Sequence, residues 1–150
     1  MHATANILIV DDEEVVRHSY ATTLSAARCR ASAACDGEEA IRAMERETFD
    51  VVLLDLRMPG EGGMAVLRRM KQRWPDREVV IITGYPSVDS AKEAVRLGAC
   101  DYLAKPLGPD EIVEAAHGAW LRKQWTLRGA AYDDDDKPSD PQSETTRSLS

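Results

Sequence analysis

The chain has 150 residues, of which 43% are hydrophobic, so it is long enough for one ordinary core and too short for two full-sized domains. Its formal net charge of -7 argues against nucleic acid as the partner, because proteins that bind the phosphate backbone present a basic face. The 3 cysteines include no C-x-x-C pair, which excludes an obvious disulfide framework or zinc site. No run of apolar residues is long enough to cross a membrane, and no basic segment precedes the first apolar run, so we expect a cytoplasmic protein.

Short apolar runs alternate along the chain with segments in which apolar residues recur three or four positions apart. The predicted elements, in chain order, are a strand over Ile7–Val10, a helix around Val16, Tyr20 and Leu24, a weaker strand over Ala31–Ala34, a helix around Ala40, Ile41 and Met44, a strand over Val51–Leu54, a helix around Leu67, Met70 and Trp74, a strand over Val79–Ile82, a helix around Val88, Ala91 and Val95, a weaker strand over Asp101–Leu103, and a helix around Ile112, Ala116 and Trp120.

This alternation predicts an α/β fold. Three of the five strands are apolar throughout, which is typical of a parallel sheet with helices on both faces, so we expect a doubly wound sandwich with a five-stranded parallel sheet. We assign one domain to residues 1–125. After about Gly129 the composition changes to Asp, Ser, Pro, Thr and Gln, and we expect residues 126–150 to form a disordered acidic and polar tail.

Polar residues stand at the ends of four predicted strands. Asp11 and Asp12 follow the first strand, Asp55 the third and Thr83 the fourth, while Lys105 follows the fifth. Open parallel sheets bind ligands beyond the carboxyl ends of their strands, so we expect these side chains to meet there. Taken singly, each is more often a helix cap or a solvated polar group. Their coincidence at one rim therefore carries the prediction.

Three neighbouring carboxylates repel one another and need a cation. Mg2+ prefers oxygen ligands and keeps waters that a phosphate group can replace, so it suits this rim. Transfer of a phosphoryl group requires its oxygens to be neutralised, which Mg2+, Lys105 and the Thr83 hydroxyl would do. We therefore expect Asp55 to be a nucleophile that accepts a phosphoryl group.

Five motifs connect the chain to a known family: Ile7-Leu8-Ile9-Val10-Asp11-Asp12-Glu13, Val51-Val52-Leu53-Leu54-Asp55-Leu56-Arg57-Met58-Pro59-Gly60, Ile82-Thr83-Gly84, Gly98-Ala99-Cys100-Asp101-Tyr102 and Lys105-Pro106. From about Asn6 to Gln124 the chain resembles the receiver domain of two-component response regulators. Asp55 to Gly60, with Thr83-Gly84-Tyr85, is similar to receivers of nitrogen-regulator-like transcription activators. The resemblance implies the flavodoxin-like (βα)5 receiver fold with strand order 2-1-3-4-5.

The resemblance also implies a role for each residue at the rim. Asp55 would be the phosphoacceptor. Mg2+ would be bound by Asp12, Asp55 and the backbone carbonyl of Arg57, with Asp11 helping through water. The phosphoryl oxygens would be bound by Thr83, Lys105 and the backbone amides of Arg57 and Gly84.

A switch follows from the same resemblance. Thr83 would move toward the phosphoryl group and Tyr102 would turn inward, and the Lys105–Pro106 bond would be cis. The altered surface would be the fourth helix, fifth strand and fifth helix, which could also form a homodimer. The expected partners are a sensor histidine kinase or phosphotransfer protein and an unknown downstream protein, without nucleic acid or membrane. Because the chain would catalyse only its own phosphorylation and dephosphorylation, we do not expect an enzyme.

Several alternatives stay open. The roughly 25 polar residues after the last helix could not form an output domain, so the chain is either a stand-alone regulator or the receiver of a larger transcription regulator. It could also be a non-phosphorylated interaction module. A haloacid-dehalogenase-like phosphatase needs a second carboxylate where this chain has Arg57, and a flavodoxin-like flavin carrier needs a hydroxyl- and glycine-rich loop where Asp11–Glu14 stands.

Overall fold

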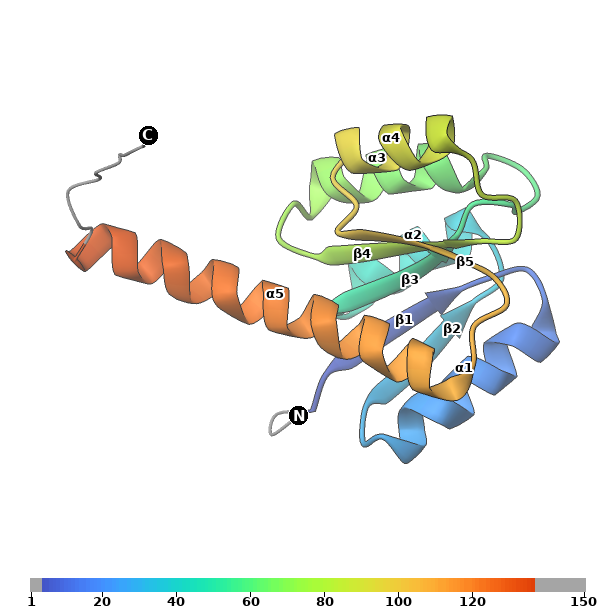
Figure 1. Cartoon of the computed structure of the whole chain (residues 1–150), viewed down its shortest axis with the longest axis horizontal. Coiled ribbons are helices and arrows are strands. Elements are labelled where there is room, and N and C mark those ends of the chain that lie inside the picture. The colour runs from blue at the N-terminus through green and yellow to red at the C-terminus, as the bar shows by residue number, and fades with distance from the viewer. Residues whose placement is uncertain (1–3, 137–150) are drawn as a thin grey trace.

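Five strands form one parallel sheet in the order β2-β1-β3-β4-β5 in the computed structural model, which describes residues 4–136, with side chains as far as residue 125 (Figure 1). The strands are β1 (Asn6–Val10), β2 (Arg30–Ala34), β3 (Val51–Asp55), β4 (Glu78–Thr83) and β5 (Asp101–Ala104). The helices are α1 (Glu14–Ala26), α2 (Gly37–Arg46), α3 (Gly63–Arg73), α4 (Val88–Arg96) and α5 (Pro109–Asp136). The predicted fold class and strand order are confirmed.

Helices cover both faces of the sheet. Because side chains alternate along a strand, Leu8 of β1 faces α2, α3 and α4, whereas Ile7 and Ile9 face α1 and α5. Every residue of β3 and β4 is buried, which explains why these strands are apolar except at their ends. Two cores result, one on each face, and both hold the central strands in place.

The loops at the carboxyl ends of the strands are fixed by close backbone packing. A Cβ atom at Gly63, the first residue of α3, would lie only 2.5 Å from the carbonyl oxygen of Asp55, so only glycine allows α3 to begin this close to β3. The preceding Gly62 has a φ of +88°, which L side chains rarely adopt. At the next loop, the Ser87 side chain caps α4 by accepting a hydrogen bond from the Ser90 amide at 3.0 Å.

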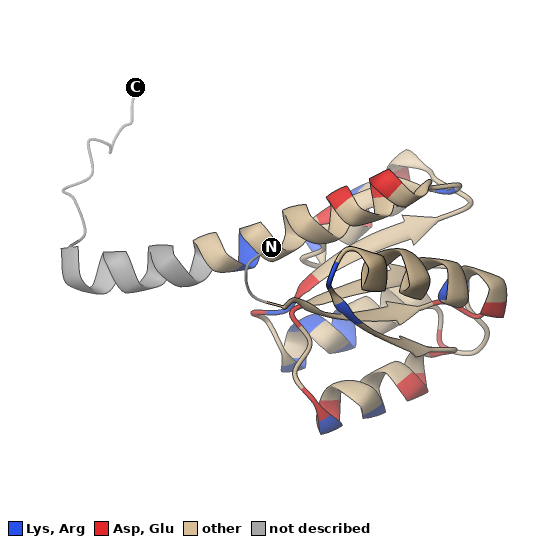
Figure 2. Ribbon diagram, turned by 90° about the horizontal axis from the view of Figure 1, so that it is seen from below, with Lys and Arg blue, Asp and Glu red and all other residues tan. Residues whose placement is uncertain are grey.

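The last helix is longer than the sequence suggests. The expected boundary at residue 125 differs from the structure, in which the α5 backbone stays helical to Asp136. Polar composition does not by itself prevent a helix, and this stretch includes alanine, leucine and arginine, which are good helix formers. The rest of the predicted tail, residues 137–150, lies outside the described residues. In Figure 2 the first turns of α5 carry acidic residues, which suit a helix N-terminus, and basic residues follow further along the helix, before the part drawn in grey.

Two ion pairs connect α5 to the end of the sheet at which the strands begin. Lys123, which is buried, donates to Asp50 Oδ1 at 2.8 Å, and Arg122 lies 3.5 Å from Glu78. Within the described residues no helix is long and apolar enough to cross a membrane.

Candidate functional site

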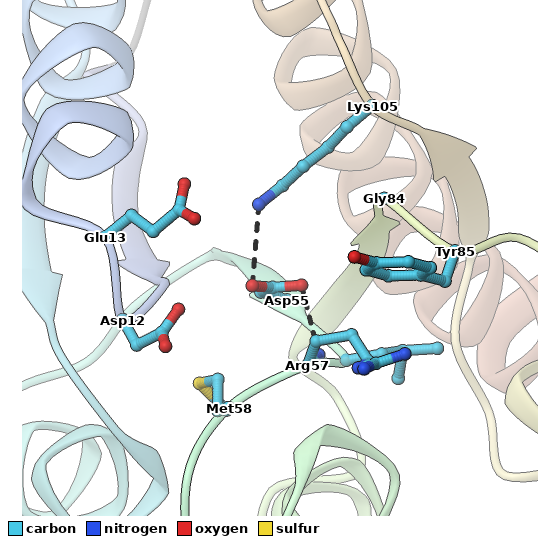
Figure 3. A pocket seen from close by; sticks show the side chains of 9 residues that line it. Asp12, Glu13, Asp55, Arg57, Met58, Gly84, Tyr85 and Lys105 are labelled. Atoms are coloured by element: carbon cyan, nitrogen blue, oxygen red, sulfur yellow. Dashed lines mark hydrogen bonds and ion pairs between the residues drawn. The ribbon is translucent and has the colours of Figure 1, made fainter.

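An acidic pocket of about 510 Å³ opens beyond the carboxyl ends of the strands. Loops that follow β1, β3, β4 and β5 form its walls (Figure 3). The lining residues are Asp12, Glu13, Asp55, Leu56, Arg57, Met58, Gly84, Tyr85 and Lys105. The predicted rim is therefore a real cavity, built from segments that are far apart in the sequence.

Asp55, the last residue of β3, lies at the centre of this pocket and is only 5% exposed. Its Oδ1 accepts a hydrogen bond from the Arg57 amide at 3.1 Å, and its Oδ2 lies 3.5 Å from the Lys105 ammonium. Burial raises the pKa of Asp55 and the charge of Asp11 raises it further, while the Arg57 amide and Lys105 act in the opposite direction. The carboxylate is thus held in place by two donors, although burial disfavours its charge.

Lys105 is the cation among these carboxylates. Its Nζ donates to Asp11 Oδ2 at 2.8 Å and, more distantly, to Asp55. Burial acts to lower the pKa of Lys105, but the hydrogen bond and charge of Asp11, together with Asp55 and Tyr20, outweigh it and raise the pKa. Lys105 therefore stays protonated and provides one positive charge to the site.

The carboxylates of Asp11, Asp12 and Asp55 form a group that suits a hard cation. One oxygen from each lies within 4.8 Å of the others. Both oxygens of Asp11 have partners, since Oδ1 accepts from the Glu13 amide at 2.9 Å and Oδ2 from Lys105. Asp12 is exposed and reaches the pocket directly. This all-oxygen donor set fits Mg2+.

Thr83 ends β4, beside the strand that carries Asp55, and is 1% exposed. Its Oγ1 accepts a hydrogen bond from the Tyr85 amide at 3.1 Å. Gly84, the next residue, lines the pocket. Neither Thr83 nor Asp11 belongs to the lining, so both predicted residues sit beside the cavity rather than in its wall.

Tyr102 connects β5 with the beginning of α4. Its half-buried ring packs against the core beneath α2, α3 and α4. The hydroxyl accepts a hydrogen bond from the Ser87 amide at 3.2 Å and forms another with the Ser90 hydroxyl. The predicted switch residue is therefore tied to the first turn of α4. The Lys105–Pro106 peptide bond is cis, as the resemblance to receiver domains implied.

One part of the site was not predicted. The guanidinium of Arg57 stacks on the Tyr85 ring, with Cζ 4.1 Å from the ring centroid. Sequence reasoning used only the backbone of Arg57 and gave Tyr85 no role at the site. The available signal was positional, because each of these residues lies two places after a site residue, Asp55 or Thr83.

Comparison with known proteins agrees with this geometry. Residues 7–117 match the family described as the response regulator receiver domain. The alginate biosynthesis transcriptional regulatory protein AlgB of Pseudomonas aeruginosa is 35% identical over 129 residues, which are 86% of this chain and 29% of that protein. The DNA-binding transcriptional regulator NtrC of Escherichia coli is 38% identical over 107 residues, which are 71% of this chain and 23% of that protein.

Solved structures show the same fold. The crystal structure of NtrX from Brucella abortus in complex with ADP superposes with a TM-score of 0.81 at 30% identity, covering 85% of this chain and 30% of that one. A CheY-like receiver domain protein of Methanospirillum hungatei gives 0.80 at 24% identity over 83% of this chain and 99% of its own.

The chain spans less than a third of the length of the curated relatives it matches. The match over residues 7–117 covers most of the chain, and the parallel sheet shares its fold with the CheY-like receiver domain protein. This chain belongs to the receiver domains of two-component response regulators.

Proposed function

We propose that this receiver accepts a phosphoryl group on Asp55 and acts as a phosphorylation-dependent switch. The observation that carries the proposal is the position of Asp55: a nearly buried carboxylate at the centre of a polar pocket, oriented by the Arg57 amide and facing Lys105. A carboxylate with no catalytic task would gain nothing from burial beside two further carboxylates, because burial disfavours its charge.

The residues present can perform the transfer. A carboxylate oxygen of Asp55 attacks the phosphorus of the donor, and the donor's leaving atom departs on the opposite side. Lys105 would neutralise one phosphoryl oxygen, and the Thr83 hydroxyl and the amides of Arg57 and Gly84 would donate to the others once Thr83 has moved toward the pocket and the Arg57 amide has left Asp55 Oδ1. Mg2+, held by Asp12, Asp55 and the Arg57 carbonyl with Asp11 behind them, would neutralise the added charge.

The phosphoryl group changes what Thr83 and Tyr102 do. In the unphosphorylated structure the Thr83 hydroxyl accepts from the Tyr85 amide, and Tyr102 is bonded to Ser87 and Ser90 at the start of α4. A group with nearly two negative charges draws the Thr83 hydroxyl inward, and Tyr102 follows into the vacated space. The equilibrium then shifts toward a different surface on α4, β5 and α5.

The proposed partners follow from this cycle. The donor is a sensor histidine kinase or phosphotransfer protein, and the α4, β5 and α5 surface binds a downstream protein or a second receiver. The matched relatives are larger transcription regulators, so we propose that this receiver controls such an activity. It catalyses only the phosphorylation of its own Asp55 and the hydrolysis of the resulting phosphoryl group. We place it in the cytoplasm, where its three thiols stay reduced.

Intact-mass spectrometry tests the proposal directly. The chain is incubated with phosphoramidate, with and without Mg2+, and compared with Asp55→Asn and with Asp101→Asn, which alters an exposed carboxylate outside the pocket. We expect one phosphoryl group on the wild type and on Asp101→Asn when Mg2+ is present, and none on Asp55→Asn. A folded wild type that gains no mass from phosphoramidate or from a histidine-kinase extract would favour the non-phosphorylated interaction module.

A further inference from the structure

Asp11 is hydrogen-bonded through every polar atom that it has. Its amide donates to the Ala34 carbonyl at 3.2 Å, and its two carboxylate oxygens accept from the Glu13 amide and from Lys105. The remaining atom, the backbone carbonyl oxygen, accepts from Nη1 of Arg17 at 3.0 Å. The loop between β1 and α1 is therefore fixed at Asp11 by four contacts, and one of them comes from a side chain for which the sequence predicted no role.

The Arg17 contact supplies a donor that the helix does not. Asp11 precedes α1, which begins at Glu14, and within the described residues no backbone amide donates to the Asp11 carbonyl. Asp11 is only 2% exposed, so water has little access to this oxygen. A buried carbonyl without a donor is unfavourable, and the guanidinium of Arg17 therefore favours the chain direction in which this oxygen is bonded.

Helix stability alone does not explain a cation at this position. Arg17 lies at the end of the first turn of α1, where the helix dipole disfavours positive charge, and arginine stays protonated in proteins. Glu14, at the start of the helix, has the charge that suits a helix N-terminus. The half-buried Arg17 is compensated instead by the acidic site, because the carboxylates of Asp11, Asp12 and Asp55 gather around the residue that it binds.

The carbonyl that Arg17 binds belongs to the peptide group between Asp11 and Asp12. This group is planar, so holding its oxygen also fixes the direction in which the chain enters Asp12. Asp12 is exposed and points into the pocket, toward Asp55 (Figure 3). We propose that Arg17 is a positioning residue, which orients Asp12 for Mg2+ through the Asp11–Asp12 peptide group. The inference rests on the proposed function, in which Asp12 binds the ion.

Titration with Mg2+ tests this inference without any phosphodonor. The amide signals of Asp12 and Glu13 are followed by NMR while Mg2+ is added to the wild type and to Arg17→Met, which keeps an aliphatic stem and removes the donor and the charge. We expect the Kd for Mg2+ to rise about ten-fold, the lower end of what residues bonded to metal ligands contribute. Loss of a positive charge by itself would favour Mg2+ binding, so weaker binding reports lost orientation.

Lys123→Ala is the matched control. Lys123 pairs with Asp50 at the opposite end of the sheet, so its loss weakens the fold without altering the pocket. This variant should bind Mg2+ as the wild type does. If it lost as much affinity as Arg17→Met, the effect would come from general destabilisation and the proposal would be wrong. A folded Arg17→Met with the wild-type Kd would also overturn it.

Phosphorylation by phosphoramidate separates positioning from catalysis. In Arg17→Met the Mg2+ concentration that gives the half-maximal rate should rise about ten-fold, while the rate at saturating Mg2+ should stay within about two-fold of the wild type. A lower rate at saturating Mg2+ with an unchanged half-maximal concentration would contradict a positioning role. A wild type that binds Mg2+ but never gains a phosphoryl group counts against the proposed function alone.

A measurement on the wild type covers the case in which Arg17→Met does not fold. The bond to the Asp11 carbonyl should restrict rotation of the Arg17 guanidinium. Its Nη protons should therefore give separate, slowly exchanging NMR signals both before and after Mg2+ is added. A guanidinium that rotates freely in the Mg2+-bound chain would overturn the proposal, because it could not hold the peptide group in place.

Discussion

The Asp55 carboxylate is needed for the proposed phosphorylation, but its position in the pocket lowers the stability of the fold. Its carboxylate is buried beside Asp11 and Asp12, and Lys105 shares its single charge between Asp11 and Asp55. In the absence of a bound cation, the folded chain therefore holds more negative charge in the pocket than its own residues neutralise. The unfolded chain keeps the same charges in water, where they interact weakly.

Replacing Asp55 with asparagine should therefore stabilise the fold. We expect the free energy of unfolding at pH 7 without Mg2+ to rise by about 1 kcal/mol, a common size for one buried polar site. Urea unfolding followed by circular dichroism measures it, and the wild type should gain more stability from added Mg2+ than the variant. A variant that is less stable than the wild type would show that the carboxylate cluster is already well neutralised.

The pH dependence has a definite sign. Because burial raises the pKa of Asp55 in the folded chain, folding favours the protonated form. The wild type is thus stabilised by protonation below the unfolded pKa and loses that stability as pH rises through the folded pKa. The advantage of Asp55→Asn should be largest at neutral pH and should shrink in acid, which unfolding curves at several pH values would measure.

At this scale the sequence predicted the polar side chains but not all of their contacts. Asp11, Asp12, Asp55 and Lys105 could be placed because strand ends are readable from apolar runs and parallel strands end at one edge. The contact between Arg57 and Tyr85 depends on the rotamers of two exposed side chains on different loops. No local pattern encodes such a contact.

Among the elements, α5 depends most on a few charged contacts. Lys123 is 8% exposed and its ammonium lies 2.8 Å from Asp50, whose other oxygen accepts from the Asn6 amide at 2.8 Å. One pair therefore joins α5 to the residue before β3 and to the start of β1. The role of Lys123 could not be predicted from the sequence, because its burial depends on the orientation of α5 about its axis relative to the sheet.

Truncating the Lys123 side chain should lower the free energy of unfolding of the domain. Lys123→Ala leaves Asp50 partly buried without its cation, and we expect a loss of about 2–3 kcal/mol, slightly below the usual cost of breaking a fully buried pair. Arg96→Ala is the matched control, since its partner Glu93 lies at the surface and such pairs contribute about 0.5 kcal/mol. Chemical denaturation of both variants would decide this, and equal losses would contradict the assigned role of the buried pair.

All five strands and all five helices could be predicted from the sequence. The signal was weakest for a strand at the edge of the sheet and for the end of the last helix. β2, an edge strand, has an exposed first residue and few large apolar residues, so its signal was faint. The backbone of α5 continues beyond residue 125, where the chain no longer has the apolar periodicity from which a helix is predicted. Elements packed on both faces, such as β3 and β4, were read correctly because burial dictates their composition.

The three cysteines of the chain differ in how far their thiols are exposed to solvent. Cys35 is exposed, Cys29 is buried, and burial together with Glu78 raises the pKa of Cys100 to about 12. At neutral pH the reactive thiolate form of Cys100 is therefore rare.

Thiol labelling should consequently report the folded state. We expect Ellman's reagent at pH 8 to modify Cys35 first in the folded chain and all three cysteines in denaturant. Cys35→Ser should remove the fast phase, whereas Cys29→Ser should leave it unchanged. Rapid modification of all three thiols without denaturant would mean that the domain opens much more readily than its buried core implies.

The path of α5 has a practical consequence. The helix begins near the edge that holds the pocket and runs back along the sheet to its pair with Asp50 at the opposite edge (Figure 1). Trp125, 72% exposed, lies beyond that pair. In a chain whose exposed Cys35 is replaced by serine, a fluorophore or a sensor-chip linkage attached through a cysteine at position 125 would therefore leave the approach to Asp55 open. Kinetics of phosphodonor binding recorded on such a surface would be free of steric interference from the attachment.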